Sequence, residues 1–401
     1  MTVRTLPTIA QPARAASTGE PGFAFDPALK AEVEGLVSGG MRDRESIKAL
    51  LAMDGERGRA LLATADELRR KVIGHRVHFR GIIELSNLCI KNCYYCGIRR
   101  DHSDVERFSL SKDEILDCTE WAAIHRYGSV VLQSGERSDE RFVSFIEDLI
   151  FNIKRQSGGA LGITLSLGEQ TAETYARWFE AGAHRYLLRI ETSSRQLYES
   201  LHPADHEYDA RVKCLHELRR IGYQVGTGVM IGLPGQTLDD LADDVLFFCE
   251  LDVDMIGMGP YVVHEATPLA NEVDNSENGR AERLDLALRM IAVVRLAMPD
   301  INIAATTALQ ALHPLGREKG LRAGANIIMP IITPTEYRKH YQLYDGKPCI
   351  EDSAGQCQEC LEGRIRSTGD VIAYAEWGDS PRAANRPSVH AGGSPTGSSE
   401  S

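Results

Sequence analysis

The sequence predicts an α/β protein built as a (β/α)8 barrel of the TIM type. Apolar segments rich in β-branched residues alternate along the chain with segments of helical periodicity, and eight such strand–helix units follow one another. In addition, 43% of the 401 residues are hydrophobic, so the chain can bury a large core. Alternating units imply a parallel sheet, and eight strands close naturally into a barrel with its chemistry at their carboxyl ends.

Each expected strand is a short apolar run, and each is followed by a turn and a helical pattern. The strands are predicted at His78–Glu84, Ser129–Gln133, Gly162–Leu167, Arg185–Ile190, Gln224–Met230, Met255–Gly259, Asn302–Thr306 and Asn326–Met329. Helices are predicted from Lys112, with Ser111 as N-cap, and at Asp139–Arg155, Thr171–Ala181, Asp209–Ile221, Asp239–Leu251 and Ala281–Met298.

Composition divides the chain into five segments. Residues 1–26 are rich in Ala, Thr, Pro and Gly, and residues 378–401 in Ser, Gly, Pro and Ala, so both ends are predicted to be disordered. Between them we expect a helical extension at 27–77, the barrel at 78–345 and a cysteine-bearing segment at 346–377. A transit peptide for an organelle would resemble the first segment and remains an alternative.

Charge and cysteine usage exclude several classes of protein. The formal net charge is −12 without a basic run, which argues against binding nucleic acid or anionic membranes. Apolar stretches are too short to span a bilayer. The nine cysteines are an odd number, and six of them form two tight groups, unlike a secreted disulfide framework. We therefore expect a cytoplasmic protein.

The first cysteine group directly follows the first predicted strand. Cys89, Cys93 and Cys96 have C-x3-C-x2-C spacing, which scattered cysteines would rarely produce. Thiolates this close ligate zinc or an iron–sulfur cluster, but structural zinc needs a fourth ligand, and His102 is outside the usual spacing. Three thiolates on a 4Fe-4S cube would leave one iron open to a substrate or cofactor, which favours a cluster.

This loop resembles that of the radical S-adenosylmethionine (SAM) superfamily, in which an aromatic residue precedes the last cysteine. Tyr95 occupies that position. The resemblance implies that SAM binds the open iron and that one electron cleaves it to methionine and a 5′-deoxyadenosyl radical. The cofactor supplies this chemistry, and the protein positions and shields it.

Polar side chains also follow the other predicted strands. Short ones such as Thr237 fit helix caps, but Arg189 and Glu191 end a buried strand and need a partner or a ligand. An arginine suits the carboxylate of SAM, and a glutamate suits its ammonium or ribose. Gly232 and Gly235 would let the backbone approach adenine or ribose, although plain turns would also use them.

Together these segments resemble the HydE-type FeFe-hydrogenase maturase family. The matching strings, in family order over roughly residues 80–345, are SNLCIKNCYYCGIRRD, VVLQSGE, TLSLGE, RYLLRIET, VMIGLPGQT, MIGMGP, TPLANE, ATTA, GANIIMP and YQLY. The resemblance implies that Glu191 and Arg211 bind SAM. It also implies a substrate cavity lined by Gln133, Thr164, Ser166, Arg189, Thr306, Thr307, Met329, Tyr341 and Tyr344. Core packing for Met329 and Tyr341, and a surface ion pair for Arg211, are the alternatives.

A second cysteine group lies near the end, at Cys349, Cys357 and Cys360. Three thiolates again suggest an iron–sulfur cluster, and zinc with Asp or His as fourth ligand is the rival. The resemblance supports an auxiliary cluster with a structural or electron-relay role rather than a catalytic one.

The function implied by the resemblance is maturation of the hydrogenase active site. The enzyme would act on a small iron complex carrying cysteine, CO and cyanide, and would help build the dithiomethylamine bridge of the diiron subcluster. Sister maturases and an electron donor would be its partners. A methylornithine synthase-like mutase is the rival within the class. A non-catalytic iron–sulfur carrier or a zinc-binding structural protein are rivals from other classes.

Overall fold

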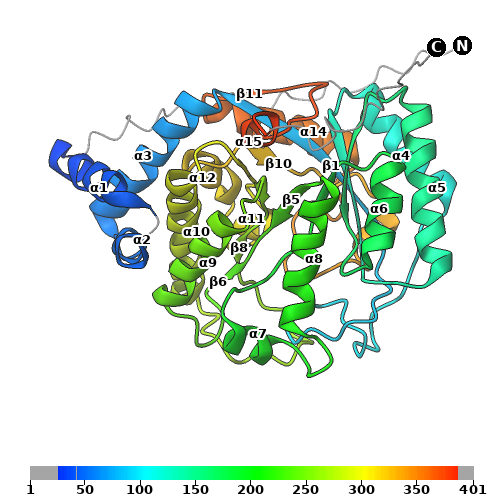
Figure 1. Cartoon of the computed structure of the whole chain (residues 1–401), viewed down its shortest axis with the longest axis horizontal. Coiled ribbons are helices and arrows are strands. Elements are labelled where there is room, and N and C mark those ends of the chain that lie inside the picture. Colours follow the sequence, from blue (N-terminus) through cyan, green and yellow to red (C-terminus); the bar gives the residue numbers. More distant parts are fainter. Residues whose placement is uncertain (1–25, 42, 387–401) are drawn as a thin grey trace, which may run out of the picture.

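The structure, a computed structural model, describes residues 26–41 and 43–386. Eight parallel strands curl around its centre with helices outside (Figure 1). Their order is β10 (Ile327–Ile328), β1 (Arg76–Ser86), β2 (Ser129–Ser134), β3 (Gly162–Ser166), β4 (Arg185–Leu187), β5 (Gln224–Thr227), β7 (Met255–Ile256) and β9 (Asn302–Ile303). A parallel bridge between Ala304 and Ile327 joins the two ends of the sheet. The predicted (β/α)8 barrel is confirmed.

Two of the predicted strands are interrupted by glycine. The run Gln224–Met230 gives β5 and then β6 (Met230–Ile231), and the run Met255–Gly259 gives β7 and then β8 (Gly259–Pro260). At the break the backbones come close together, since a Cβ on Gly228 would lie 2.2 Å from the Gly257 carbonyl oxygen. β6 and β8 then pair with each other as a parallel extension of the barrel wall.

Helices follow the strands as the periodicity predicts. The helices between β1 and β9 along the chain are α4 (Lys112–Ile124), α5 (Glu140–Gln156), α6 (Ala172–Glu180), α7 (Arg195–Leu201), α8 (Tyr208–Ile221), α9 (Leu238–Glu250) and α10 (Glu277–Ala297). Shorter ones are α11 (Thr307–Leu312), α12 (Gly316–Arg322) and α13 (Thr335–Arg338). Ser111 caps α4 in a capping box with Glu114, and Thr237 caps α9 in the same way with Asp240. The side chains of Ser111 and Thr237 therefore accept hydrogen bonds from backbone amides at the helix starts.

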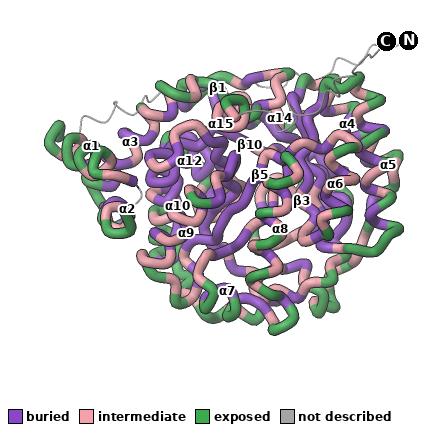
Figure 2. The backbone as a smooth tube through the Cα atoms, viewed as in Figure 1, coloured by how far each residue is buried: buried purple, intermediate pink, exposed green. Residues whose placement is uncertain are grey.

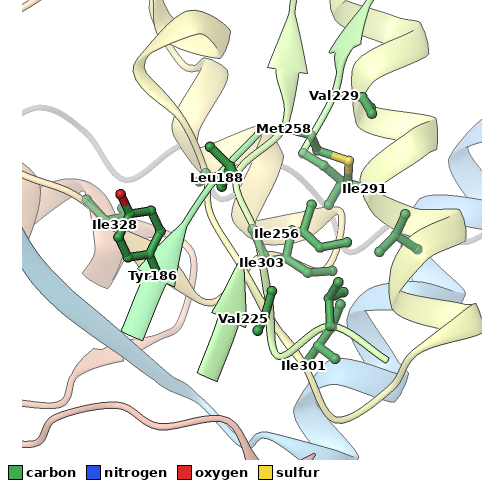
Figure 3. Packing of buried hydrophobic residues seen from close by; sticks show 14 of the residues in the cluster. Tyr186, Leu188, Val225, Val229, Ile256, Met258, Ile291, Ile301, Ile303 and Ile328 are labelled. Carbon is green, nitrogen blue, oxygen red and sulfur yellow. The ribbon is translucent and has the colours of Figure 1, made fainter. Parts of the chain in front are cut away.

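The core lies between the outer face of the strands and the helices around them. Buried residues follow the strands and the inner sides of the helices (Figure 2). Figure 3 shows Ile256 of β7 and Ile303 of β9 beside Ile291 of α10. These residues are at most 1% exposed, so their burial contributes to the apolar driving force that holds helices on the barrel.

Three helices precede the barrel: α1 (Pro27–Gly40), α2 (Arg44–Leu51) and α3 (Gly55–Val72). α3 packs against α10 and α2 against α9, at one side of the barrel (Figure 1). Lys48 adds an ion pair to Asp239 at 2.8 Å. The buried Arg69 of α3 contacts Asp370 at 3.0 Å, and this ion pair joins the helices before the barrel to the C-terminal part of the chain.

The C-terminal part contains α14 (Ala354–Ser367), β11 (Val371–Ile372), which pairs with β1, and α15 (Pro381–Ala384). The prediction of a disordered tail from residue 378 therefore starts too early, since the structure describes the chain up to residue 386. Gly378 accepts hydrogen bonds from Arg80 (2.9 Å) and Asn302 (2.8 Å), and Asp379 contacts Arg185 at 2.7 Å. Buried arginines need acceptors, and this segment supplies them. Predicted disorder at residues 1–25 and 387–401 lies outside the described residues.

Within the described part of the chain, the helices that are long enough to cross a bilayer are not apolar enough to do so.

We expect Asp370→Ala to lower the free energy of unfolding by about 3 kcal/mol, because it leaves the buried Arg69 guanidinium with Asp66 as its remaining carboxylate. Denaturant unfolding measures this change. Glu56→Ala, which breaks an exposed pair with Arg59, is the control and should change stability by less than about 0.5 kcal/mol. Equal effects for the two variants would contradict this account.

Candidate active site

The first cysteine group lies on the loop between β1 and α4. The Asn87 amide anchors the start of this loop: its Nδ2 donates to the carbonyl oxygens of Glu106 and His340 (2.7 Å each), and its Oδ1 accepts from the Phe108 amide (2.8 Å). Gly135, after β2, packs directly under the loop, since a Cβ there would lie 2.3 Å from the Leu88 oxygen. The loop is thus held by its own residues and by the segments that follow β2 and β10.

All three thiols face the cavity at the carboxyl ends of the strands. Burial raises the pKa of Cys93 to about 12 and raises the pKa values of Cys89 and Cys96, so without a metal the thiols stay protonated. Among the described residues no three His, Cys, Asp or Glu side chains surround a single metal ion. Cys89, Cys93 and Cys96 line one cavity, and three cysteine thiolates are donors of the kind that hold iron–sulfur clusters.

The cavity encloses about 310 Å³, a size that holds a small molecule. Besides the thiols, the predicted residues that line it are Tyr95, Gln133, Ser166, Arg189, Glu191, Arg211, Thr306, Thr307, Met329, Tyr341 and Tyr344. Met329 and Tyr341 therefore face the cavity rather than serving only as core. The Thr307 and Tyr344 hydroxyls lie 2.6 Å apart, and burial raises the pKa of Tyr344 to about 12.

Arg189 and Glu191 form an ion pair of 3.1 Å at the end of β4. Glu191 has a left-handed backbone (φ 68°), which its hydrogen bonds with Gly228 (3.0 Å) and Met230 (3.0 Å) maintain. Arg189 Nε and Glu191 Oε2 are buried without a hydrogen bond, although Oε2 is the oxygen that lies 3.1 Å from Arg189 Nη2 in the ion pair. Unpaired buried polar atoms in a cavity are ready to bind a ligand.

Arg211 lies on α8 with its side chain only 8% exposed, which excludes the surface ion pair. Its Nε donates to Glu169 (2.5 Å) and its Nη1 to the Arg189 carbonyl (2.8 Å). Glu169 also contacts Lys91 of the cysteine loop at 2.9 Å. Burial alone would raise the pKa of Glu169, but the cations of Arg211 and Lys91 lower it by more. The net effect is a lowered pKa, so the carboxylate stays ionised.

Sequence reasoning missed Lys91, Glu136 and Glu169 as members of this network. Burial raises the pKa of Glu136, whose carboxylate lies 3.4 Å from Lys91 and accepts from the Glu169 amide at 3.0 Å. The strings SGE and LGE, which end in Glu136 and Glu169, follow two predicted strands, and this position could have indicated that both glutamates belong to the site. A second pair, Lys347 with Glu84, also lines the cavity and was not predicted.

Two predicted residues lie elsewhere. Thr164 is one layer deeper than Ser166 on β3, and its hydroxyl accepts from Arg185 Nε at 3.0 Å, so it belongs to the packed lower barrel. Gly232 (φ 80°) forms a turn: its amide donates to Gln236 (2.7 Å), and a Cβ there would lie 2.5 Å from Arg283. Neither of the two lines the cavity.

The second cysteine group gathers beside α14, outside the residues that line the cavity. Cys357 is buried and Cys360 exposed on this helix, and Cys349 precedes it. A hydrogen bond from the Cys357 thiol and the nearby Arg317 (3.7 Å) lower the pKa of Cys349 to about 6. The two thiols are thus adjacent, and a basic side chain faces them.

Residues 83–248 match the model of the radical SAM superfamily. The chain is 44% identical to the FeFe-hydrogenase maturase subunit HydE of Thermotoga maritima over 84% of its own length and 94% of that protein. This chain belongs to the HydE family of radical SAM enzymes. A 3-methylornithine synthase of Methanosarcina barkeri is 26% identical over 75% of this chain and 82% of its own length.

Solved structures share the HydE-family fold seen here. Methylornithine synthase PylB has a TM-score of 0.72 at 24% identity, covering 86% of this chain and 97% of its own. The maturase HydG of Carboxydothermus hydrogenoformans has 0.71 at 19% identity, covering 87% and 80%. Membership of the superfamily implies a 4Fe-4S cluster and SAM, and the three cavity-facing thiols fit both.

We expect Gly135→Ala to abolish most cluster binding, because the added methyl group would displace the loop at Leu88 and Cys89. Iron content and visible absorbance after anaerobic reconstitution measure this. Gly35→Ala, in α1 with open space around it, is the matched control and should reconstitute normally. Normal iron binding by Gly135→Ala would show that the loop does not depend on this close approach.

Proposed function

We propose that this HydE-family enzyme uses SAM radical chemistry to help build the dithiomethylamine bridge of the hydrogenase diiron subcluster. One observation carries the proposal: three thiols line a cavity that the Arg189–Glu191 pair also lines, and this pair has buried polar atoms without a hydrogen bond. A 4Fe-4S cluster on Cys89, Cys93 and Cys96, with SAM bound, would supply a 5′-deoxyadenosyl radical on reduction.

The residues around the thiols suit the two ends of SAM. Arg211 offers a buried guanidinium for its carboxylate, and Glu191 offers a carboxylate for an ammonium or a ribose hydroxyl, since its Oε2 is ion-paired with Arg189 but makes no hydrogen bond. Tyr95 adds an aromatic surface at the cavity wall. Glu169 and Lys91 hold Arg211 and the cysteine loop in fixed relation to each other.

The substrate we propose is a small iron complex that carries cysteine, CO and cyanide. The cavity is also lined by hydroxyl groups from Thr306, Thr307 and Tyr344, an amide from Gln133 and the Arg189 cation. Such donors suit carboxylate and cyanide groups. A cavity inside the barrel would limit the access of water to a radical intermediate.

Cys349, Cys357 and Cys360 are proposed to hold an auxiliary iron–sulfur cluster. Their thiols do not line the cavity, which supports a structural or electron-relay role. Sister maturases that supply or accept the iron complex, and an electron donor, are the proposed partners. We place the enzyme in the cytoplasm, without nucleic-acid or membrane partners, in line with its acidic charge.

The reconstituted, reduced protein is expected to convert SAM to 5′-deoxyadenosine, as measured by chromatography. Cys93→Ala should reduce the product to background, because the remaining two thiols cannot hold the cluster. Cys357→Ala is the matched control, and it should lose the second cluster's iron while retaining SAM cleavage. Bound iron without product in the wild-type protein would instead support a cluster carrier, and bound zinc a structural protein.

Arg211→Met should weaken SAM binding by about tenfold to a hundredfold, because it removes a buried charge-assisted contact. Equilibrium dialysis of the reconstituted enzyme with labelled SAM gives the affinity. Arg220→Met, on the exposed side of the same helix, is the control and should bind SAM normally. Unchanged affinity for Arg211→Met would remove this residue from the SAM site.

A further inference from the structure

The segment between α7 and α8 is attached to the cysteine loop through the loop's backbone. The Tyr94 amide donates to the Leu201 carbonyl at 2.9 Å. The Asn92 amide donates to the ring nitrogen Nε2 of His206, also at 2.9 Å. Both amides flank Cys93, the central thiol of the group, so this segment fixes the backbone that carries it.

A second histidine of the same segment contacts the aromatic residue of the loop. His202 Nε2 lies 3.3 Å from the Tyr95 hydroxyl, and the two rings meet edge to face with centroids 5.5 Å apart. Tyr198 packs on the other side of His202, with ring centroids 4.1 Å apart. His202 is therefore held between α7 and the cysteine loop.

The hydrogen bonds define the protonation of both rings. His202 Nδ1 lies 2.8 Å from the Tyr198 carbonyl and donates to it, so its Nε2 is the acceptor for the Tyr95 hydroxyl. The Asn92 amide donates to His206 Nε2 at 2.9 Å, so this nitrogen carries no proton, while His206 Nδ1 lies 2.8 Å from an Asp205 carboxylate oxygen without a hydrogen bond to it. Only a neutral imidazole with its proton on Nδ1 can serve in this way.

Ordinary core packing does not explain this arrangement. The two rings are 3% and 4% exposed, and a buried histidine can satisfy its nitrogens with any nearby group. Here each ring points Nε2 at the cysteine loop, while Nδ1 of His202 donates to the Tyr198 carbonyl and Nδ1 of His206 faces the Asp205 carboxylate. Asn92 and Tyr95 bracket Cys93, so the two contacts act on either side of one thiol.

We propose that His202 and His206 are positioning residues that set the shape of the cysteine loop and the orientation of Tyr95 toward SAM. This inference rests on the proposed function, because it assumes that the loop holds the cluster and that Tyr95 lines the SAM site. His206 fixes the backbone through Asn92, and His202 fixes the aromatic ring through its hydroxyl.

A double-mutant cycle on Tyr95 and His202 tests the side-chain contact. Tyr95→Phe and His202→Phe each remove one partner, and both should weaken SAM binding by about 3- to 10-fold, the range for one hydrogen bond. Because both changes remove the same bond, the double variant should be no weaker than the weaker single variant. Additive losses would overturn the contact as the origin of the effect.

The backbone contact is tested through the spectrum of the reduced cluster. His206→Phe should alter the electron paramagnetic resonance line shape and its change on addition of SAM, while His206→Gln, whose amide oxygen can accept from Asn92, should restore both. His216→Phe, at an exposed position of α8, is the matched control. Wild-type spectra for His206→Phe would overturn the proposal, and if that variant does not fold, the Tyr95–His202 cycle decides.

Failure of the proposed function gives a different result. A wild-type protein that binds no cluster or does not bind SAM would refute the function itself. Wild-type protein with both properties, together with variants that match the His216→Phe control in SAM affinity and spectrum, would refute only the role of the two histidines.

Discussion

Closure of the parallel sheet is the constraint on which the rest of the structure depends. Because all eight strands run in one direction, their carboxyl ends meet at one mouth, and residues from distant parts of the chain line a single cavity. The cysteine loop after β1, the ion pair after β4 and the hydroxyl groups after β9 are brought together in this way. A bridge between Ala304 and Ile327 completes the ring that makes this convergence possible.

Buried charge gives the two ends of the barrel different characters. At the amino ends of the strands, Gly378 and Asp379 accept hydrogen bonds from the buried Arg80 and Arg185, although Arg80 Nε and Arg185 Nη2 have no partner. At the carboxyl ends, Arg189 and Glu191 also have polar atoms without a hydrogen bond, but these two residues line the cavity. The first arrangement stabilises the fold, and the second is suited to bind a ligand.

The sequence was most informative where a local pattern decides the structure. Periodicity located the eight barrel strands, and the spacing of Cys89, Cys93 and Cys96 located the loop that faces the cavity. Depth along a strand could not be predicted: Thr164 and Ser166 share one face of β3, but only Ser166 reaches the cavity. Contacts between distant segments could not be predicted either. The composition of residues 378–386 does not reveal that Gly378 and Asp379 accept hydrogen bonds from buried arginines of the barrel.

The central claim is that three thiolates hold a cluster whose fourth iron is open to SAM inside the barrel. Electron–nuclear double resonance of the reduced protein, with SAM labelled at its amino nitrogen and carboxylate oxygens, tests this claim most directly. The account predicts hyperfine coupling from both labels, as direct ligation of the open iron requires. A cluster signal without either coupling, in protein shown to bind SAM, would contradict it.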